Sequence, residues 1–220
     1  MFAYCLNNPV ILEDTSGSAA RVCISADGLI DDTPWNDHSP GGGGRPTAGC
    51  GERWDYIIDQ DAPGVGDLTL GLASVSHGGC GVVAAYNALI TLGAGESFES
   101  VLGYFNRYPG MYVAYGFLGT LPDHVARFFE SKGYRVIMTH DRGKIDAYSQ
   151  TADACIMWYA WPKSYGPFHA FGAHFVHYRK DNGGYVAYNV GSSGTSTFMI
   201  PSVFGYTGRR AFALGIFIYK

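Results

Sequence analysis

The sequence predicts an α+β domain in which helices come first along the chain and an antiparallel sheet follows. Apolar residues recur with a helical period between residues 81 and 131, whereas they alternate with period two from residue 134 onward. Within the second region, Asp181–Gly184 reads Asp-Asn-Gly-Gly, a strong hairpin signal. The 220 residues also include 31 glycines, 16 tyrosines and 13 phenylalanines, a composition typical of short strands and tight turns.

Three segments are expected to be helical. Gly81–Leu92 has apolar residues at positions 82, 83, 86, 89 and 90, and Gly93 stands where a left-handed residue commonly ends a helix. Phe98–Tyr108 repeats the pattern more weakly. The third helix is expected to start near Thr120–Asp123, a capping-box-like sequence with a proline in the first turn, and to stop at Gly133.

The period-two region predicts six strands, which the hairpin signal arranges as an antiparallel sheet. Their ranges are Tyr134–Thr139, Ala154–Tyr159, His174–Arg179, Tyr185–Val190, Ser196–Ile200 and Ala211–Tyr219.

Composition and charge exclude several classes of protein. Hydrophobic residues make up 47% of the chain and charged residues 15%, which excludes a disordered protein. The formal net charge is −4 and no basic stripe is present, so nucleic acid is not an expected partner. The stretch between Asp67 and Glu96 carries no charged residue, but serines, a histidine and a glycine cluster interrupt it, which favours a buried turn and core helix over a membrane span.

The cysteines and the N-terminus indicate the compartment. The chain has five scattered cysteines without a CxxC pair, which predicts free thiols in a reducing environment. They are Cys5, Cys23, Cys50, Cys80 and Cys155. The N-terminus has no basic region followed by an apolar run, so a secretory signal is not expected and the predicted location is cytoplasmic.

The chain divides into an N-terminal extension, residues 1–67, and a body, residues 68–220. The extension begins with short apolar runs suited to strands and turns, and Asp31–Asp67 is rich in Asp, Pro and Gly. Its tetraglycine, Gly41–Gly44, is followed by neither Gly-Lys-Ser/Thr nor a helix, which favours a linker over a phosphate-binding loop.

Cys80 is the first candidate for chemistry. It lies in Ser76–Gly81, directly before the most apolar predicted helix. The N–H groups and the positive dipole end of a helix N-terminus favour a thiolate, and flanking glycines allow close approach of a substrate. A small buried hydrophobic cysteine is the alternative, and position alone does not separate the two.

His174 and Asn189 form the second candidate. His174 begins one predicted strand and Asn189 ends the hairpin partner, so the two can face each other across the ladder. Taken alone, His174 is more typical of a hydrogen-bonded core histidine and Asn189 of a turn former. A helix-terminal Cys, a strand His and an Asn on the next strand together have the order of a thiolate–imidazolium pair oriented by a third group.

With these residues the sequence resembles the papain-like cysteine peptidases, most closely the bacterial branch that processes bacteriocins after double-glycine leaders. The resemblance lies in Cys80-Gly81, in His174-Phe175-Val176 and in Tyr188-Asn189, and it covers about residues 68–220. It implies helices packed on a C-terminal antiparallel sheet and a Cys-His-Asn triad. Ala173 replaces the family's glycine before the His.

The resemblance also implies an oxyanion-binding glutamine about six residues before the nucleophile. Ser74 stands there in this chain. Ser74, Ser76 or the more distant Gln60 is therefore the candidate side-chain donor.

The expected function is a cysteine peptidase that cleaves peptide or amide bonds of a peptide or protein substrate, without a cofactor. Two alternatives are a transglutaminase-like acyltransferase and a non-catalytic binding module that retains the fold. His77 is an alternative base for Cys80. A zinc site from His169, His174, His177 and Cys80 is disfavoured because residues 174 and 177 face opposite sides of a strand. Neither a metal nor a membrane partner is expected, and the oligomeric state is not predicted.

Overall fold

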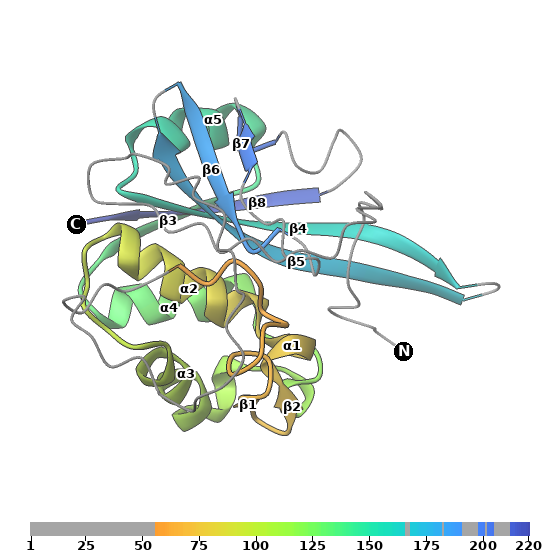
Figure 1. Cartoon of the computed structure of the whole chain (residues 1–220). Helices are drawn as coiled ribbons and strands as arrows, with labels where there is room; N and C mark the ends of the chain where they lie inside the picture. The colour runs from red at the N-terminus through yellow and green to blue at the C-terminus, as the bar shows by residue number, and fades with distance from the viewer. Residues whose placement is uncertain (1–55, 166–167, 182, 191–197, 201, 205–211) are drawn as a thin grey trace, which may run out of the picture. The chain divides into compact units, whose positions relative to one another are not determined.

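A computed structural model describes residues 56–220 except for 166–167, 182, 191–197, 201 and 205–211. It is a mixed helical and antiparallel structure, which confirms the α+β class (Figure 1). Within the described residues, no helix combines the length and the apolar character needed to cross a membrane. The predicted N-terminal strands and the tetraglycine lie outside the described residues.

The helical elements precede most of the sheet, as predicted. In chain order they are α1 (Val75–Gly78), α2 (Cys80–Thr91), α3 (Phe98–Arg107), η1 (Pro109–Met111), η2 (Ala114–Gly116), α4 (Pro122–Ser131) and α5 (Arg142–Thr151). Gly93 and Gly133 have the positive φ expected of residues that end a helix. The start of α4 differs from the prediction, because Leu121 rather than Thr120 precedes the helix and its N–H donates to Nδ1 of His124 at 3.2 Å.

In the part of the chain that the structure describes, six strands form one antiparallel sheet in the order β3-β8-β4-β5-β6-β7. Their bounds are β3 (Arg135–Thr139), β4 (Ala154–Tyr165), β5 (Phe168–Asp181), β6 (Gly184–Tyr188), β7 (Phe198–Ile200) and β8 (Phe212–Tyr219). The predicted hairpin is present, with Asp181 paired to Gly184. A separate two-stranded ladder joins β1 (Thr69–Leu70) and β2 (Ala73–Ser74) ahead of α1.

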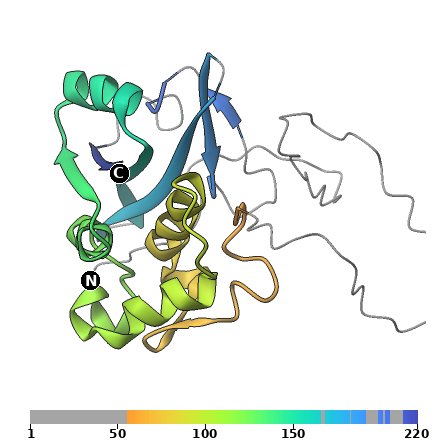
Figure 2. The ribbon, with the colours of Figure 1, turned by 90° about the vertical axis from the view of Figure 1, so that its left-hand side faces the viewer.

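Helices cover both faces of the large sheet (Figures 1 and 2). Helices α2, α3 and α4 lie on one face, whereas α5 lies on the other face and packs on a second core through Ile145. The sequence pattern predicts no helix at α5. Only Ile145 and Ser149 of this helix are buried, so its apolar periodicity is weak.

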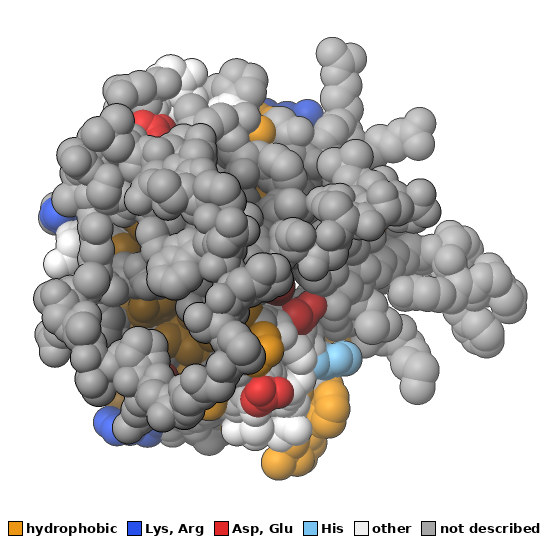
Figure 3. All heavy atoms as spheres, in the orientation of Figure 1, with side chains coloured by type: hydrophobic (Ala, Val, Ile, Leu, Met, Phe, Trp, Pro, Cys, Tyr) orange, Lys and Arg blue, Asp and Glu red, His pale blue; other side chains and the backbone are white. Residues whose placement is uncertain are grey.

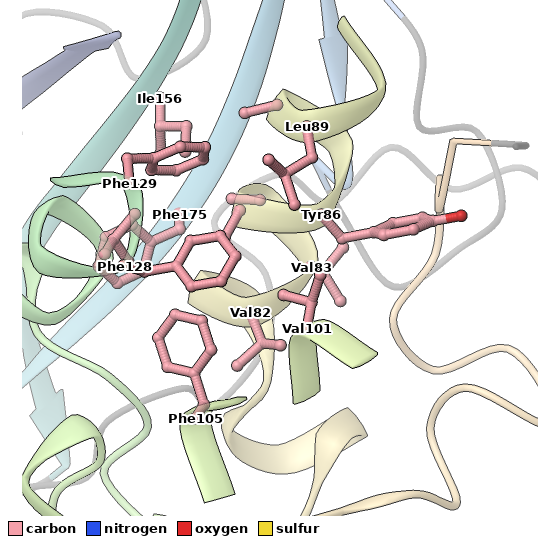
Figure 4. Packing of buried hydrophobic residues seen from close by; sticks show 14 of the residues in the cluster. Val82, Val83, Tyr86, Leu89, Val101, Phe105, Phe128, Phe129, Ile156 and Phe175 are labelled. Carbon is pink, nitrogen blue, oxygen red and sulfur yellow. The ribbon is translucent and has the colours of Figure 1, made fainter. Parts of the chain in front are cut away.

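Helix α2 is the centre of the larger core (Figure 4). It is buried from Cys80 through Leu89, and the residues of the same core include Phe175 of β5, Val101 and Phe105 of α3, and Phe128 of α4. A helix enclosed in this way has little freedom to shift, so it holds its first residue, Cys80, in a fixed position.

The segment 56–67 belongs to the same compact unit as the body, which differs from the predicted boundary at residue 67. Asn87 of α2 binds this segment in two places: its Oδ1 accepts from the N–H of Ile57 and its Nδ2 donates to the Ile57 carbonyl, both at 2.8 Å. Gln60 is 5% exposed. The body therefore begins earlier than the composition change indicates.

Candidate active site

Cys80 is the first residue of α2, which begins one position before Gly81, the start that the sequence predicts. The turn before it is α1, whose N-cap Ser74 accepts a hydrogen bond from the N–H of His77 at 3.3 Å. The glycines around Cys80 are required by packing, since a Cβ on Gly78 would lie 2.3 Å from the Gly116 carbonyl oxygen and one on Gly81 would lie 1.9 Å from Oγ1 of Thr120. Close contact on several sides thus fixes the turn that carries the sulfur.

His174 lies on β5 at a point where its neighbour β6 has already ended. The last paired residue of β6 is Tyr188, opposite His177, so the edge of β5 beside His174 is occupied by the chain that leaves β6. There, Nε2 of His174 lies 2.6 Å from the carbonyl oxygen of Asn189. The His174 ring is also hydrogen-bonded to the side chain of Cys80. The structure therefore brings the predicted sulfur and imidazole together.

The Asn189 carbonyl determines which ring nitrogen is basic. A carbonyl oxygen only accepts, so Nε2 must carry a proton to bond it. In the neutral imidazole the lone pair then resides on Nδ1, which becomes the nitrogen able to take a proton from a thiol.

The contact of Asn189 with His174 differs from the predicted one. Its carboxamide does not orient the ring; instead Oδ1 accepts from the N–H of Gln60 at 3.1 Å, and Nδ2 donates to Oε1 of Gln60 at 3.0 Å. The residue has φ of 60°, in the left-handed region that Asn tolerates better than most residues. The backbone carbonyl, not the side chain, is the third group.

The surroundings of His174 favour its protonated form. Burial lowers the pKa of its imidazole, but the hydrogen bond to the Cys80 side chain and the charge of that sulfur, the Asn189 carbonyl and the charge of Asp61 together raise the pKa above the ordinary value. An imidazolium beside the sulfur in turn favours the thiolate. These are the electrostatics of a thiolate–imidazolium pair.

The three oxyanion candidates all lie in the turn or segment near Cys80, and each has another partner. The hydroxyls of Ser74 and Ser76 lie 2.8 Å apart, and Ser74 also caps α1. Nε2 of Gln60 donates to the Ser76 carbonyl at 2.8 Å. Of the three, Gln60 also reaches the His174 side of the site through Asn189.

The other histidines considered have different surroundings. The ring of His77 lies edge-on to Phe117 at 6.0 Å. On the face of the molecule drawn in Figure 3, hydrophobic side chains reach the surface beside a histidine. His177 contacts Thr91 at the far end of α2, with Nε2 2.7 Å from its hydroxyl. The side chain of His169 lies outside the described residues.

No cluster of three or more His, Cys, Asp or Glu side chains able to hold a metal ion occurs in the described part of the chain. Two of the five cysteines are described, Cys80 and Cys155, and neither forms a disulfide bond. Burial raises the pKa of Cys155, which makes it a poor nucleophile. Cys5, Cys23 and Cys50 lie outside the described residues.

Two features of the site were missed from the sequence. The charge of Asp61 raises the pKa of His174. The hydrogen-bonded pair Gln60–Asn189 joins residues that are 129 positions apart. A polar Asp-Gln-Asp stretch at 59–61 is visible in the sequence, but it has no spacing that distinguishes it from a loop.

No protein-family model and no curated protein sequence matches this chain. The function is therefore inferred from the site itself.

Proposed function

We propose that this protein is a cysteine peptidase with a papain-like fold, in which Cys80 is the nucleophile and His174 is the general base and acid. The observation that carries the proposal is the hydrogen bond between the His174 ring and the side chain of Cys80 at the N-terminus of a buried helix. Packing alone would explain neither the pairing of His174 with a cysteine nor the position of that cysteine at a helix N-terminus.

The first half of the reaction forms an acyl-enzyme. Nδ1 of His174 takes the thiol proton, and the Cys80 sulfur attacks the carbonyl carbon of the scissile amide. The resulting oxyanion accepts hydrogen bonds from N–H groups in the first turn of α2, where the helix dipole adds to the stabilisation. When the C–N bond breaks, His174 gives its proton to the leaving amine and a thioester remains on Cys80.

The second half releases the acid. His174, again neutral, takes a proton from water, and the hydroxide oxygen attacks the thioester carbonyl. Collapse of the tetrahedral intermediate breaks the C–S bond, releases the carboxylic acid and restores the Cys80–His174 pair. The hydrogen bond of Nε2 to the Asn189 carbonyl keeps the ring in the orientation and tautomer that both halves need.

Alkylation of Cys80 as a function of pH tests the nucleophile. We expect iodoacetamide to modify the Cys80 peptide at pH 6, well below the ordinary thiol pKa of about 8.5, because His174 stabilises the thiolate. His174→Gln should slow this reaction at pH 6 by about 10- to 100-fold, which corresponds to a shift of one to two pKa units. Modification is read by peptide mass spectrometry, so that Cys5, Cys23 and Cys50 do not interfere.

Cys155 is an internal control: burial raises the pKa of its thiol, so it should stay unmodified at pH 6 in the folded protein. Cleavage is measured separately, as new N-termini released from a mixture of unstructured peptides by the wild type but by neither Cys80→Ser nor His174→Gln. If Cys80 reacts only above pH 8 and identically in His174→Gln, the pair is not functional and the proposed peptidase activity is wrong.

A further inference from the structure

Gln60 makes hydrogen bonds to both sides of the candidate site. Toward His174, the backbone N–H of Gln60 donates to Oδ1 of Asn189 at 3.1 Å, and its Oε1 accepts from Nδ2 of Asn189 at 3.0 Å. Toward Cys80, its Nε2 donates to the carbonyl of Ser76 in the turn before the nucleophile, at 2.8 Å. Gln60 is 5% exposed and Asn189 is 1% exposed, so water does not compete strongly for these bonds.

The two bonds to Asn189 fix a conformation that the backbone does not prefer. Asn189 has φ of 60°, which is less favourable for a residue with a Cβ than the usual α or β regions. With both ends of its side chain held by Gln60, the residue cannot relax without breaking buried hydrogen bonds. Its carbonyl consequently stays within 2.6 Å of Nε2 of His174.

The same segment also carries a charge that acts on the site. Asp61 follows Gln60 directly, and its carboxylate favours the protonated form of His174. Anchoring Gln60 therefore fixes both its own contacts with Asn189 and the position of the next residue, Asp61, whose carboxylate acts on His174.

We infer that Gln60 is a positioning residue for the Cys80–His174 pair: it fixes the Asn189 carbonyl that orients the imidazole and ties it to the turn that carries the nucleophile. The inference rests on the proposed function, and it departs from the oxyanion role that the sequence suggests for Gln60. The contacts support this difference, because one N–H of Nε2 donates to the Ser76 carbonyl and Oε1 accepts from Asn189, so both ends of the carboxamide are held by the protein.

The test compares alkylation with catalysis in Gln60→Ala and in the near-isosteric Gln60→Met. A positioning role predicts that both variants lower the rate of iodoacetamide modification of Cys80 at pH 6 by about tenfold, one pKa unit, while leaving the rate at pH 9.5 within about twofold of wild type. An oxyanion donor would instead leave the alkylation profile unchanged and lower only kcat for peptide cleavage, because alkylation forms no oxyanion.

Asn87→Ala is the matched control. Asn87 is a second buried amide that anchors the same segment, but both of its 2.8 Å bonds go to the backbone of Ile57 rather than to Asn189. The Asn87→Ala variant should lower the unfolding midpoint as much as Gln60→Ala does, but it should leave the pH dependence of Cys80 alkylation unchanged. The positioning role would be overturned if wild type and both Gln60 variants had the same pH profile of Cys80 alkylation. It would also be overturned if Gln60→Ala and Asn87→Ala shifted that profile equally.

An NMR measurement separates this inference from the peptidase proposal. The proton on Nε2 of His174, held by a buried carbonyl, should give a slowly exchanging ring N–H resonance in the wild type and lose it in Gln60→Ala but not in Asn87→Ala. That result would support the positioning role even if Cys80 proved unreactive at pH 6. A resonance that persists in Gln60→Ala would contradict the role whatever the activity.

Discussion

At the scale of single residues, the choice between the backbone and the side chain of Asn189 decides how His174 is held. A carboxamide side chain can rotate and can present either oxygen or nitrogen to a ring. A backbone carbonyl can only accept, so its 2.6 Å contact with Nε2 specifies one tautomer. The carboxamide is then free to bind Gln60, and it connects the base to a segment far away in the sequence.

Substitutions of Asn189 can separate its two contributions. Asn189→Gly and Asn189→Ala both lose the bonds to Gln60, but only glycine adopts φ near 60° without cost, whereas alanine is disfavoured there by about 1–2 kcal/mol. We therefore expect iodoacetamide to modify Cys80 at pH 6 about tenfold more slowly in Asn189→Ala than in Asn189→Gly. If the two variants lose the same reactivity, the side chain rather than the carbonyl orients the ring.

At the scale of elements, helix α2 positions the nucleophile because it is packed on all sides. Its apolar residues contact the sheet through Phe175 and contact α3 and α4 through Val101, Phe105 and Phe128. The first turn is the tightest part, since Gly81 lies directly against Thr120 and Phe175. A change there moves Cys80 relative to His174, whereas a change on an exposed helix does not.

Gly81→Ala tests this element. The added Cβ would lie 1.9 Å from Oγ1 of Thr120 and 3.2 Å from Phe175, so we expect the free energy of unfolding to fall by about 1–3 kcal/mol in urea titrations, with a slower reaction of Cys80 at pH 6. The control is Gly103→Ala in α3, where no atom lies within 4 Å and alanine should stabilise by up to about 1 kcal/mol.

Adding Thr120→Ala to Gly81→Ala removes the clashing hydroxyl, which is buried and has no hydrogen-bond partner among the described residues. The double variant should recover part of the lost stability. A Gly81→Ala protein as stable and as reactive as wild type would show that the first turn of α2 adjusts freely.

Sequence patterns predict the elements that have strong local signals. The helix that ends at Gly93 and the hairpin at Asp181–Gly184 are examples, since period and turn chemistry depend on neighbouring residues. Helix α5 has too few buried residues to give a period. The role of the Asn189 carbonyl depends on a φ angle and on Gln60, 129 residues away, and no pattern of adjacent residues contains that information.

At the scale of the whole molecule, the two ends of α2 contact two histidines of β5 with opposite electrostatics. His174 meets Cys80 at the N-terminus and its pKa is raised, whereas His177 meets Thr91 near the C-terminus. Burial lowers the pKa of His177 to about 3. The hydrogen bond of its Nδ1 to the Cys155 carbonyl opposes this shift, and the charge of Arg179 adds to it. His174 thus belongs to the candidate site, whereas His177 is a neutral part of the core.

The pH dependence of stability should reveal His177. Its folded pKa lies below the unfolded value of about 6.5, so the unfolded state binds the extra proton between pH 6.5 and pH 3, and stability present above pH 6.5 is lost as the pH falls. This effect alone should lower the free energy of unfolding by about 1.4 kcal/mol per pH unit, or about 2 kcal/mol at pH 5. His174 contributes the opposite sign, since a raised pKa stabilises at low pH and this stabilisation is lost as the pH rises.

The variant His177→Gln isolates the contribution of His177, because His174 is common to both proteins. We expect the variant to be less stable than wild type at pH 7.5, since it lacks the imidazole that bonds both Thr91 and Cys155 and stacks near Tyr188. Its deficit should shrink by about 2 kcal/mol at pH 5, measured by urea titration at both values. A constant deficit would mean that His177 binds its proton equally in the folded and unfolded states, and the sheet would then tolerate a charge beside Tyr188 and Arg179.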